Sequence, residues 1–190
     1  MTLWQLRLDE FRDQTASAAP TPGGGSVACV CATLGAGLVI MAGEITRKTK
    51  PAAELAELDR LLDELRALSA QLSASAEADV AVFGDFMAAL KLPRGSDDEK
   101  AARKQAIGRA AVAACEAPLE AAGAMRLCLT LTANGGALIK PEVESDVKAG
   151  ADLLRGALTA VLYNVDINLP YVPDGDVKRT LVARLNELRR

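Results

Sequence analysis

The fold is decided by residues 51–90, which read PAAELAELDRLLDELRALSAQLSASAEADVAVFGDFMAAL. Apolar side chains recur there every three or four positions, the spacing that lines one face of an α-helix. They are Leu55, Leu58, Leu62, Leu65, Leu72, Ala76, Phe83, Phe86 and Leu90. This apolar seam predicts one long amphipathic helix that buries its apolar face against other helices.

The same spacing recurs along the rest of the chain. The sequence predicts further helices at residues 3–17, 27–46, 97–117, 118–131 and 145–167, and a closing helix that ends in ARLNELRR (183–190). The proline at 118 is expected to begin or kink a helix, and SDDE (96–99) has the spacing of a capping box. We therefore predict an all-α antiparallel bundle of six to seven helices, folded as a single domain over residues 1–190.

The composition supports this class and excludes several functions. Half of the residues are apolar but only 3% are aromatic, and the chain contains no histidine. Without histidine there is no Ser-His-Asp or Cys-His catalytic unit, no HExxH zinc site and no two-His metal triad. The net charge of −3, from 22 basic and 25 acidic side chains, is not typical of a nucleic-acid-binding protein.

The cysteines and the apolar stretches indicate the compartment. The four cysteines (29, 31, 115 and 128) form no CxxC pair and are typical of packing residues in a reducing cytoplasm. The amphipathic, acidic N-terminus is unlike a signal peptide. The uncharged run at 27–43 is rich in small residues and predicts a helix buried on nearly all sides rather than a membrane span. Because a chain of this size has difficulty surrounding such a helix, we expect part of it to lie in an oligomer interface.

Asp79 breaks the apolar seam of the long helix. It lies on the same helical face as Leu72, Ala76, Phe83 and Phe86. A carboxylate at such a position is costly unless it is paired or lines a cavity, where it would suit a general acid or base. The alternative is an aspartate paired with an Arg or Lys of a neighbouring helix for structure alone, and the seam by itself leaves both open.

Asn164 and Asn168 form a second polar feature on an apolar face. They are four residues apart on the helix predicted at 145–167, in register with Asp146. Two carboxamides on one face can bind the donors and acceptors of a ligand. Alternatively they cap the end of the helix, because Pro170 follows directly.

The stretch PTPGGGS (20–26) is the third feature, with Pro22, Gly23, Gly24, Gly25 and Ser26 directly before a helix. Backbone N–H groups of such glycines can close on an anion at a helix N-terminus. The stretch lacks the GK[ST] of a phosphate-binding loop. A tight turn with Ser26 as the N-cap is the alternative.

Together these motifs resemble the cyclodeaminase/cyclohydrolase family, which comprises the cyclodeaminase half of formiminotransferase-cyclodeaminase and the free-standing methenyltetrahydrofolate cyclohydrolases. The resemblance covers about residues 5–176. In chain order it rests on APTPGGGSVA (19–28), DVAVF (79–83), KLPRGSDDEKAARKQAI (91–107), APL (117–119), SD (145–146) and YNVDINL (163–169).

The resemblance implies an all-helical homodimer with sites near the subunit interface, a reduced folate as substrate and neither metal nor organic cofactor. The catalytic residues that the resemblance implies are Asp79, which corresponds to the aspartate of the family, and Lys50, which aligns with a basic position. Substrate contacts correspond to the glycine stretch from Pro22 to Ser26 and to Asp146, Asn164 and Asn168. Arg47, Lys48 and Lys50 are candidates for the glutamate tail, and Phe83, Phe86 and Tyr163 are candidates for stacking on the pterin.

The implied reaction is hydrolysis of 5,10-methenyltetrahydrofolate to 10-formyltetrahydrofolate, and the free-standing length favours it over formiminotetrahydrofolate cyclodeaminase, the sibling activity. A second hypothesis is a diverged member with another ligand, because TRKTKPAAE (46–54), IKPEVESD (139–146) and Lys148 depart from the family pattern. A third is a structural oligomerisation bundle in which Asp79 is merely paired.

Overall fold

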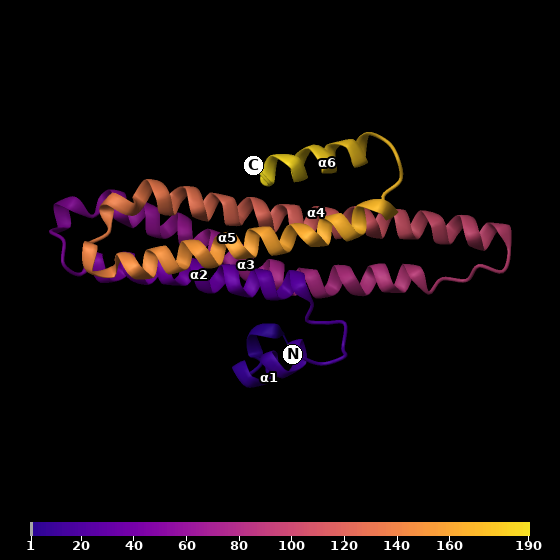
Figure 1. Cartoon of the computed structure of the whole chain (residues 1–190), viewed down its shortest axis with the longest axis horizontal. Helices are drawn as coiled ribbons and strands as arrows, with labels where there is room; N and C mark the ends of the chain where they lie inside the picture. Colours follow the sequence, from indigo (N-terminus) through magenta and orange to yellow (C-terminus); the bar gives the residue numbers. More distant parts are fainter. Residues whose placement is uncertain (1) are drawn as a thin grey trace.

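The computed structural model describes residues 2–190, which fold into six α-helices and no strand (Figure 1). This confirms the predicted all-α class. The helices are α1 (Leu8–Thr15), α2 (Gly24–Arg47), α3 (Ala56–Leu90), α4 (Asp97–Gly135), α5 (Glu144–Asn168) and α6 (Asp176–Leu188). Short 3₁₀ turns lie at Leu3–Gln5, Ala52–Glu54, Gly136–Leu138, Pro141–Val143 and Leu169–Tyr171.

Helices α2 to α5 form an antiparallel four-helix bundle (Figure 1). In this bundle α2 and α4 each pack against both α3 and α5. The predicted apolar seam faces the interior, where Leu58, Leu62, Leu65 and Leu72 are fully buried. Each buried leucine contributes about 1.5–3 kcal/mol, so the seam is a main source of the stability of the bundle.

The small residues of α2 allow its backbone to lie directly against α5. A Cβ added to Gly35 would lie 2.8 Å from the carbonyl oxygen of Gly150, and a Cβ added to Gly150 would lie 2.5 Å from the carbonyl oxygen of Gly35. Neither position has room for a side chain. This contact fixes the antiparallel register of the two helices.

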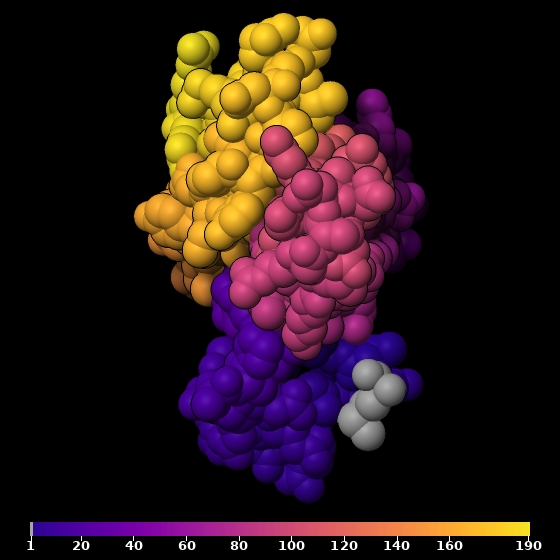
Figure 2. Space-filling model, turned by 90° about the vertical axis from the view of Figure 1, so that its right-hand side faces the viewer, coloured from indigo at the N-terminus to yellow at the C-terminus, as the bar shows by residue number. Residues whose placement is uncertain are grey.

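The two terminal segments lie outside the bundle, on opposite sides of it (Figures 1 and 2). On one side, the Trp4 indole N–H donates to the Ser73 carbonyl oxygen of α3 at 3.0 Å. On the other side, Arg126 of α4 donates to the Leu188 carbonyl oxygen at the end of α6, at 2.6 Å. The site described below lies in the bundle between them.

Two helix boundaries differ from the sequence prediction. The predicted helix at 3–17 is a 3₁₀ turn followed by α1. Ser26 is not an N-cap, because α2 begins at Gly24 and its N-cap is Gly23. The predicted capping box is confirmed: the Ser96 hydroxyl accepts from the Glu99 amide at 3.2 Å, and the Glu99 carboxylate accepts from the Ser96 amide at 3.0 Å.

Pro118 neither begins nor ends a helix, because α4 continues through it. A proline has no N–H, so the carbonyl of Ala114, four residues earlier, has no intrahelical donor. The side-chain amide of Asn168 on α5 donates to that carbonyl oxygen at 3.2 Å. A neighbouring helix thus supplies the donor that the proline lacks.

Among residues 2–190, α2 is the one helix long and apolar enough to cross a membrane. Half of its most apolar stretch is buried inside the protein. The core helix of a bundle can have the same length and composition, so this observation alone does not indicate that α2 spans a membrane.

Candidate functional site

A cavity of about 340 Å³ opens at the end of the bundle where α2 begins. It lies between the glycine stretch before α2, the second half of α3, the middle of α4 and the end of α5. Its lining includes Asp79, Asn164, Asn168 and the stretch from Gly23 to Gly25. The structure thus brings together three features that lie far apart in the sequence.

Asp79 is held by the N-terminal turn of α2. Both the backbone amide and the hydroxyl of Ser26 donate to Asp79 Oδ2, at 2.8 and 2.7 Å. The positive end of the α2 dipole lies at the same place and favours the charged carboxylate. No Lys or Arg among residues 2–190 forms an ion pair with Asp79, so the purely ion-paired alternative is not what the structure shows.

Gly25 has to be a glycine because Asp79 and Asn164 converge on it. A Cβ added to Gly25 would lie 2.1 Å from Asp79 Oδ1 and 2.7 Å from Asn164 Nδ2. Both distances are far inside van der Waals contact. The absent side chain therefore leaves the space in which the free carboxylate oxygen and the amide of Asn164 face each other.

The two asparagines offer different groups to the cavity. Asn168 Nδ2 donates to the Ala114 and Asn164 carbonyl oxygens, at 3.2 and 2.8 Å, so both of its hydrogens are occupied. Asn164 Nδ2 is buried and has no hydrogen-bond partner among residues 2–190. A buried donor without a partner costs about 1–3 kcal/mol, which a bound acceptor would recover. Asn164 therefore has an amide donor that no protein group uses, whereas the amide hydrogens of Asn168 are used within the wall.

Aromatic and apolar side chains form the rest of the cavity. Phe83 and Phe86 line it, as expected for stacking. The third ring is Tyr171, whose edge meets the face of Phe86 with 5.3 Å between ring centroids. Tyr163, the third ring expected from the sequence, is 64% exposed and does not line this cavity.

The sequence analysis gave no part in the site to several lining residues, among them Met87, Ile167 and Tyr171. Helical spacing could have found them. Asp79, Val82, Phe83, Phe86 and Met87 follow one face of α3, and Asn164, Ile167, Asn168 and Tyr171 continue at three-residue and four-residue steps from α5. The missing information was which stretch of each apolar face lines a cavity rather than the core.

Cys29 lies one turn after Ser26 and is not a nucleophile. Burial, and secondarily the negative charge of Asp79, raises the pKa of its thiol to about 12. The thiolate is the reactive form, so Cys29 stays an inert thiol near neutral pH. Cys115 and Cys128 are also buried free thiols, which agrees with the prediction that the cysteines are packing residues.

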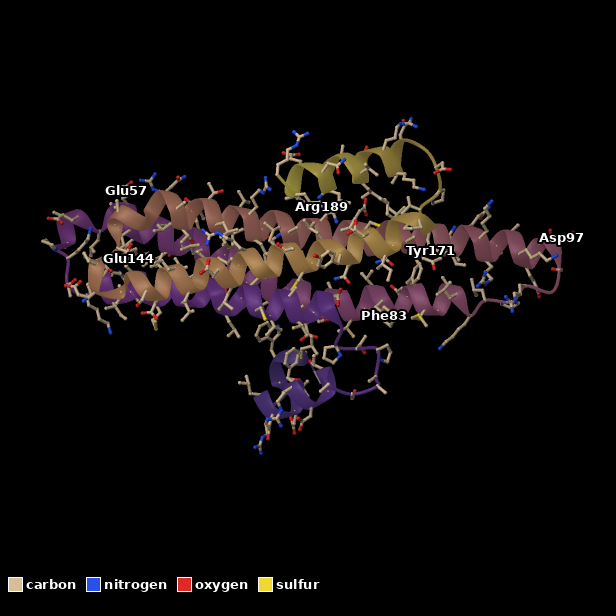
Figure 3. All side chains as sticks on the ribbon, viewed as in Figure 1. Glu57, Phe83, Asp97, Glu144, Tyr171 and Arg189 are labelled. Carbon is tan, nitrogen blue, oxygen red and sulfur yellow. The ribbon has the colours of Figure 1, made fainter. Side chains whose placement is uncertain are left out.

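Lys50 and Asp146 lie far from Asp79 in the same chain. Ser26 contacts Asp79 at the start of α2, whereas Lys50 follows its end, after about 30 Å of helix. Asp146 lies in the first turn of α5, about 27 Å of helix before Asn164. In Figure 3, Glu144 and Glu57 mark that far end of the bundle, away from Phe83 and Tyr171.

The segments that depart from the family pattern lie at the same far end. The Lys140 amide donates to the Thr46 hydroxyl at 3.2 Å, which joins the two segments. Arg47, one of the candidates for the substrate tail, forms an ion pair with Asp59 at 2.9 Å. The residues that depart from the family pattern therefore do not line the cavity of this chain.

An all-α bundle with an aspartate held at a helix N-terminus, amides beside it and aromatic walls defines a class of small-molecule-binding helical proteins. No group of three or more His, Cys, Asp or Glu side chains within residues 2–190 could hold a metal ion. The formiminotransferase-cyclodeaminase family matches residues 7–187. The chain belongs to this family.

Individual relatives cover most of the chain. It is 32% identical to the methenyltetrahydrofolate cyclohydrolase of Methylorubrum extorquens, over 88% of this chain and 81% of that protein. It is also 32% identical to the formimidoyltransferase-cyclodeaminase of Gallus gallus, over 87% of this chain but only 31% of that protein. The chain thus spans about a third of that longer relative.

A solved structure has the same fold. The formiminotetrahydrofolate cyclodeaminase of Thermotoga maritima superimposes with a TM-score of 0.85 at 26% sequence identity, over 98% of this chain and 90% of that one. The bundle and its turns are therefore shared over nearly the whole length.

Proposed function

We propose that this protein hydrolyses 5,10-methenyltetrahydrofolate to 10-formyltetrahydrofolate. The observation that carries the proposal is the cavity in which Asp79 Oδ1 and the unpartnered Asn164 Nδ2 both border the space left by Gly25. The Methylorubrum relative, named as a cyclohydrolase, supports the choice of reaction.

In this proposal the substrate supplies the electrophile and Asp79 handles the protons. Water attacks the methenyl carbon of the cationic five-membered ring while Asp79 Oδ1 accepts a proton from it. The bond from that carbon to N5 then breaks, its electron pair stays on N5, and Asp79 returns the proton there. The hydroxyl left on the carbon loses its own proton to solvent, which leaves a formyl group on N10. The net reaction releases one proton, and the carboxylate stabilises the bound cation before attack.

Each wall of the cavity has a part in holding the pterin. Asn164 Nδ2, which has no partner in the free protein, donates a hydrogen bond to an acceptor of the ring, and this bond orients the ring. Phe83 and Tyr171 provide apolar faces for stacking. The chemistry requires neither metal nor organic cofactor.

Formiminotetrahydrofolate cyclodeaminase activity is the second candidate, supported by the name and high structural similarity of the Thermotoga protein. This reaction closes the same five-membered ring from a formimino group and expels ammonia. It also needs a carboxylate that accepts the proton of N10 as N10 attacks the formimino carbon and that donates a proton to the nitrogen leaving as ammonia. The same residues would serve both reactions.

The test is direct and uses the purified protein. Loss of methenyl absorbance measures the hydrolase, and ammonia release from the formimino substrate measures the cyclodeaminase. Asp79→Asn keeps the shape of the side chain but removes the base, so we expect it to abolish turnover while the variant still binds a folate. If wild type shows neither activity, or if Asp79→Asn retains full activity, the proposal fails.

We further propose a homodimer in the cytoplasm. The exposed side chains of Leu34 and Met41, 55% and 40% exposed, lie with Leu38 on one face of α2. Leu153 of α5 extends this apolar patch, since it lies 3.1 Å from the position of a Cβ on Gly35. Light scattering should give twice the chain mass for wild type, and Leu34→Asp with Met41→Asp should give monomers.

A role for Lys50 requires this dimer, because within one chain the helix length separates it from Asp79. We propose that Lys50 of one copy reaches the cavity of the other. Asp79→Asn and Lys50→Met proteins, each inactive alone, should regain up to about a quarter of wild-type activity when unfolded together and refolded, because mixed dimers contain one intact site. No recovery from the mixture would exclude the shared site.

A further inference from the structure

A second cavity adjoins the candidate site and carries a strong positive charge. Its volume is about 630 Å³, and it lies between the α3–α4 connection, the first half of α4 and the segment 170–178. Five basic side chains line it, Arg94, Lys100, Arg103, Lys104 and Lys178, against a single acidic one, Asp174. The whole chain has a net charge of −3, so this concentration of cations is local.

Some of these basic side chains form ion pairs within the protein, and others form none. Lys178 pairs with Asp174 at 2.9 Å and Lys100 with the exposed Asp97 at 2.8 Å. Arg94 and Lys104 form no ion pair among residues 2–190. Clustered like charges repel each other unless an anion binds between them, so the cavity favours an anionic ligand.

Another basic hollow on the molecule serves as a comparison. It is lined by Arg126, Arg155 and Arg189 at the C-terminal end of α6. There Arg126 donates to the Leu188 carbonyl, Arg155 pairs with Asp152 and Arg189 pairs with Asp166. Those three arginines have structural partners, some of which dock α6 onto the bundle. Arg190, which also lines that hollow, is its single cation without a polar side-chain partner among residues 2–190, whereas the second cavity has two, Arg94 and Lys104.

The second cavity is a neighbour of the cavity that contains Asp79. Tyr171 lines both cavities. Both also follow α4, from Ala117 in the first cavity to Lys104 in the second, which is about 20 Å of helix. Seen from the end of the bundle, the segments around residues 95–110 and 165–175 lie directly against each other (Figure 2).

The wall that carries Tyr171 is fixed by close packing. A Cβ added to Gly108 of α4 would lie 2.8 Å from Pro173 Cγ, so the proline ring rests directly on the helix backbone. Arg103 joins the other side, since its guanidinium donates twice to the Leu90 carbonyl at the end of α3, at 3.2 and 2.9 Å. The cavity is therefore built into the fold rather than formed by free loops.

We propose that this second cavity binds the glutamyl carboxylates of the folate tail while the ring system occupies the cavity of Asp79. The inference rests on the proposed function. Tyr171 lies where the benzoyl group would join the two parts of the ligand. Arg94 and Lys104 take the role that Arg47, Lys48 and Lys50 were expected to have from the sequence.

The test measures binding and needs no turnover. 5-Formyltetrahydrofolate carrying one or five glutamyl residues is titrated into the protein in a calorimeter. We expect wild type to bind the pentaglutamate roughly tenfold more tightly, as the summed effect of several solvent-exposed ion pairs. This advantage should shrink at high salt, because exposed charges are screened.

Substitutions in the second cavity then test whether its cations cause the tighter binding of the pentaglutamate. Arg94→Glu combined with Lys104→Glu should remove the advantage of the pentaglutamate, because it should weaken binding of the pentaglutamate more than binding of the monoglutamate, which has fewer carboxylates. Arg109→Glu is the control for a single charge reversal, which is half the change of the double variant, at an exposed position of α4 that does not line this cavity, and it should keep the advantage.

Each outcome separates this inference from the proposed function. Equal affinity for the two ligands in wild type, or an advantage that survives in the double variant, overturns the tail site and leaves the proposed function standing. No binding of either ligand overturns both. If inorganic phosphate binds to the cavity and the pentaglutamate still has no advantage, the cavity is an anion site of another kind and the inference is wrong.

Discussion

Two contacts of single residues define the candidate site. Gly25 has no room for a methyl group, because Asp79 Oδ1 and Asn164 Nδ2 occupy its surroundings. Ser26, the next residue, is fully buried, and both its amide and its hydroxyl donate hydrogen bonds to the other carboxylate oxygen, Asp79 Oδ2. One residue thus makes space for the free oxygen of Asp79, while its neighbour fixes the orientation of the carboxylate.

Gly25→Ala is therefore expected to damage the site severely. A methyl group 2.1 Å from Asp79 Oδ1 must displace the carboxylate, and a displacement of about 1 Å can cost a hundredfold in rate. We expect kcat/KM to fall by at least about a hundredfold. Gly24→Ala is the control, because a Cβ there meets nothing within 4 Å; an equal loss in both variants would contradict the steric explanation.

Ser26→Ala removes one of the two donors to Asp79 Oδ2. We expect the free energy of unfolding to fall by about 2 kcal/mol, because a buried hydrogen bond to a charged group is lost. Turnover should fall by about tenfold, since the backbone amide still holds the carboxylate. Ser75→Ala removes a hydroxyl that bonds only the Gln71 carbonyl of its own helix, and kcat should be unchanged there.

At the scale of whole elements, Pro118 and Asn168 link α4 to α5. The proline leaves the Ala114 carbonyl without its usual donor, and Asn168 supplies one across the helix interface. This pair explains why α4 is continuous although the sequence predicted a break there. Propensity alone treats a proline as a helix breaker, and it contains no information about a donor fifty residues away.

A double-mutant cycle measures this link. Asn168→Ala should cost about 1–3 kcal/mol in wild type, because the Ala114 carbonyl loses its donor. In a Pro118→Ala background the new backbone N–H can bond that carbonyl, so the same substitution should cost less. Urea unfolding of the four proteins checks this, and strictly additive effects would show that the two residues are independent.

For the whole molecule, the bundle separates its two ends. The cavity with Asp79 lies where α2 begins, and the basic cavity lies further toward the α3–α4 connection. Lys50, Asp146 and the segments that depart from the family pattern lie toward the other end. The all-α class, the seam and most helices could be predicted from periodicity, because each helix shows its buried face locally. The resemblance selected Asp79, Asn164 and Asn168 correctly as neighbours in one cavity.

Contacts between segments that are distant in the chain could not be predicted from the sequence. The glycine stretch was expected either to close on an anion or to form a tight turn, yet Gly24 and Gly25 begin α2. At Gly25 the missing side chain makes room for Asp79 and Asn164, a contact that the order of the chain does not show. Similarly, basic residues were sought after α2, whereas the cations beside the cavity come from the start of α4 and from Lys178. The order of the chain does not show which ends of four helices meet.

The buried thiols predict a loss of stability at alkaline pH. Burial raises the pKa of Cys29 to about 12 and those of Cys115 and Cys128 to about 11 from 9.0. A thiol whose folded pKa is raised contributes stability that is complete below pH 9 and is lost as the pH rises toward 11 to 12, because only the unfolded chain ionises there. By pH 10 the loss should be roughly 1 kcal/mol per thiol.

Urea unfolding between pH 8 and pH 10 measures this effect. Cys128→Ala should flatten the dependence of the unfolding free energy on pH by about one third. The matched change at the half-buried Cys31 should leave the dependence as it is in wild type. A dependence that Cys128→Ala does not alter would assign the alkaline loss to other groups.

The bond between the Ser26 amide and Asp79 also gives the site a spectroscopic reporter. That proton belongs to a backbone group that can be followed by nuclear magnetic resonance, yet it is bound to the carboxylate proposed to move protons. Its chemical shift and its rate of exchange with deuterium should respond whenever Asp79 gains a proton or a ligand enters. The state of the site is thus readable at a single amide, without substrate turnover and without altering any residue.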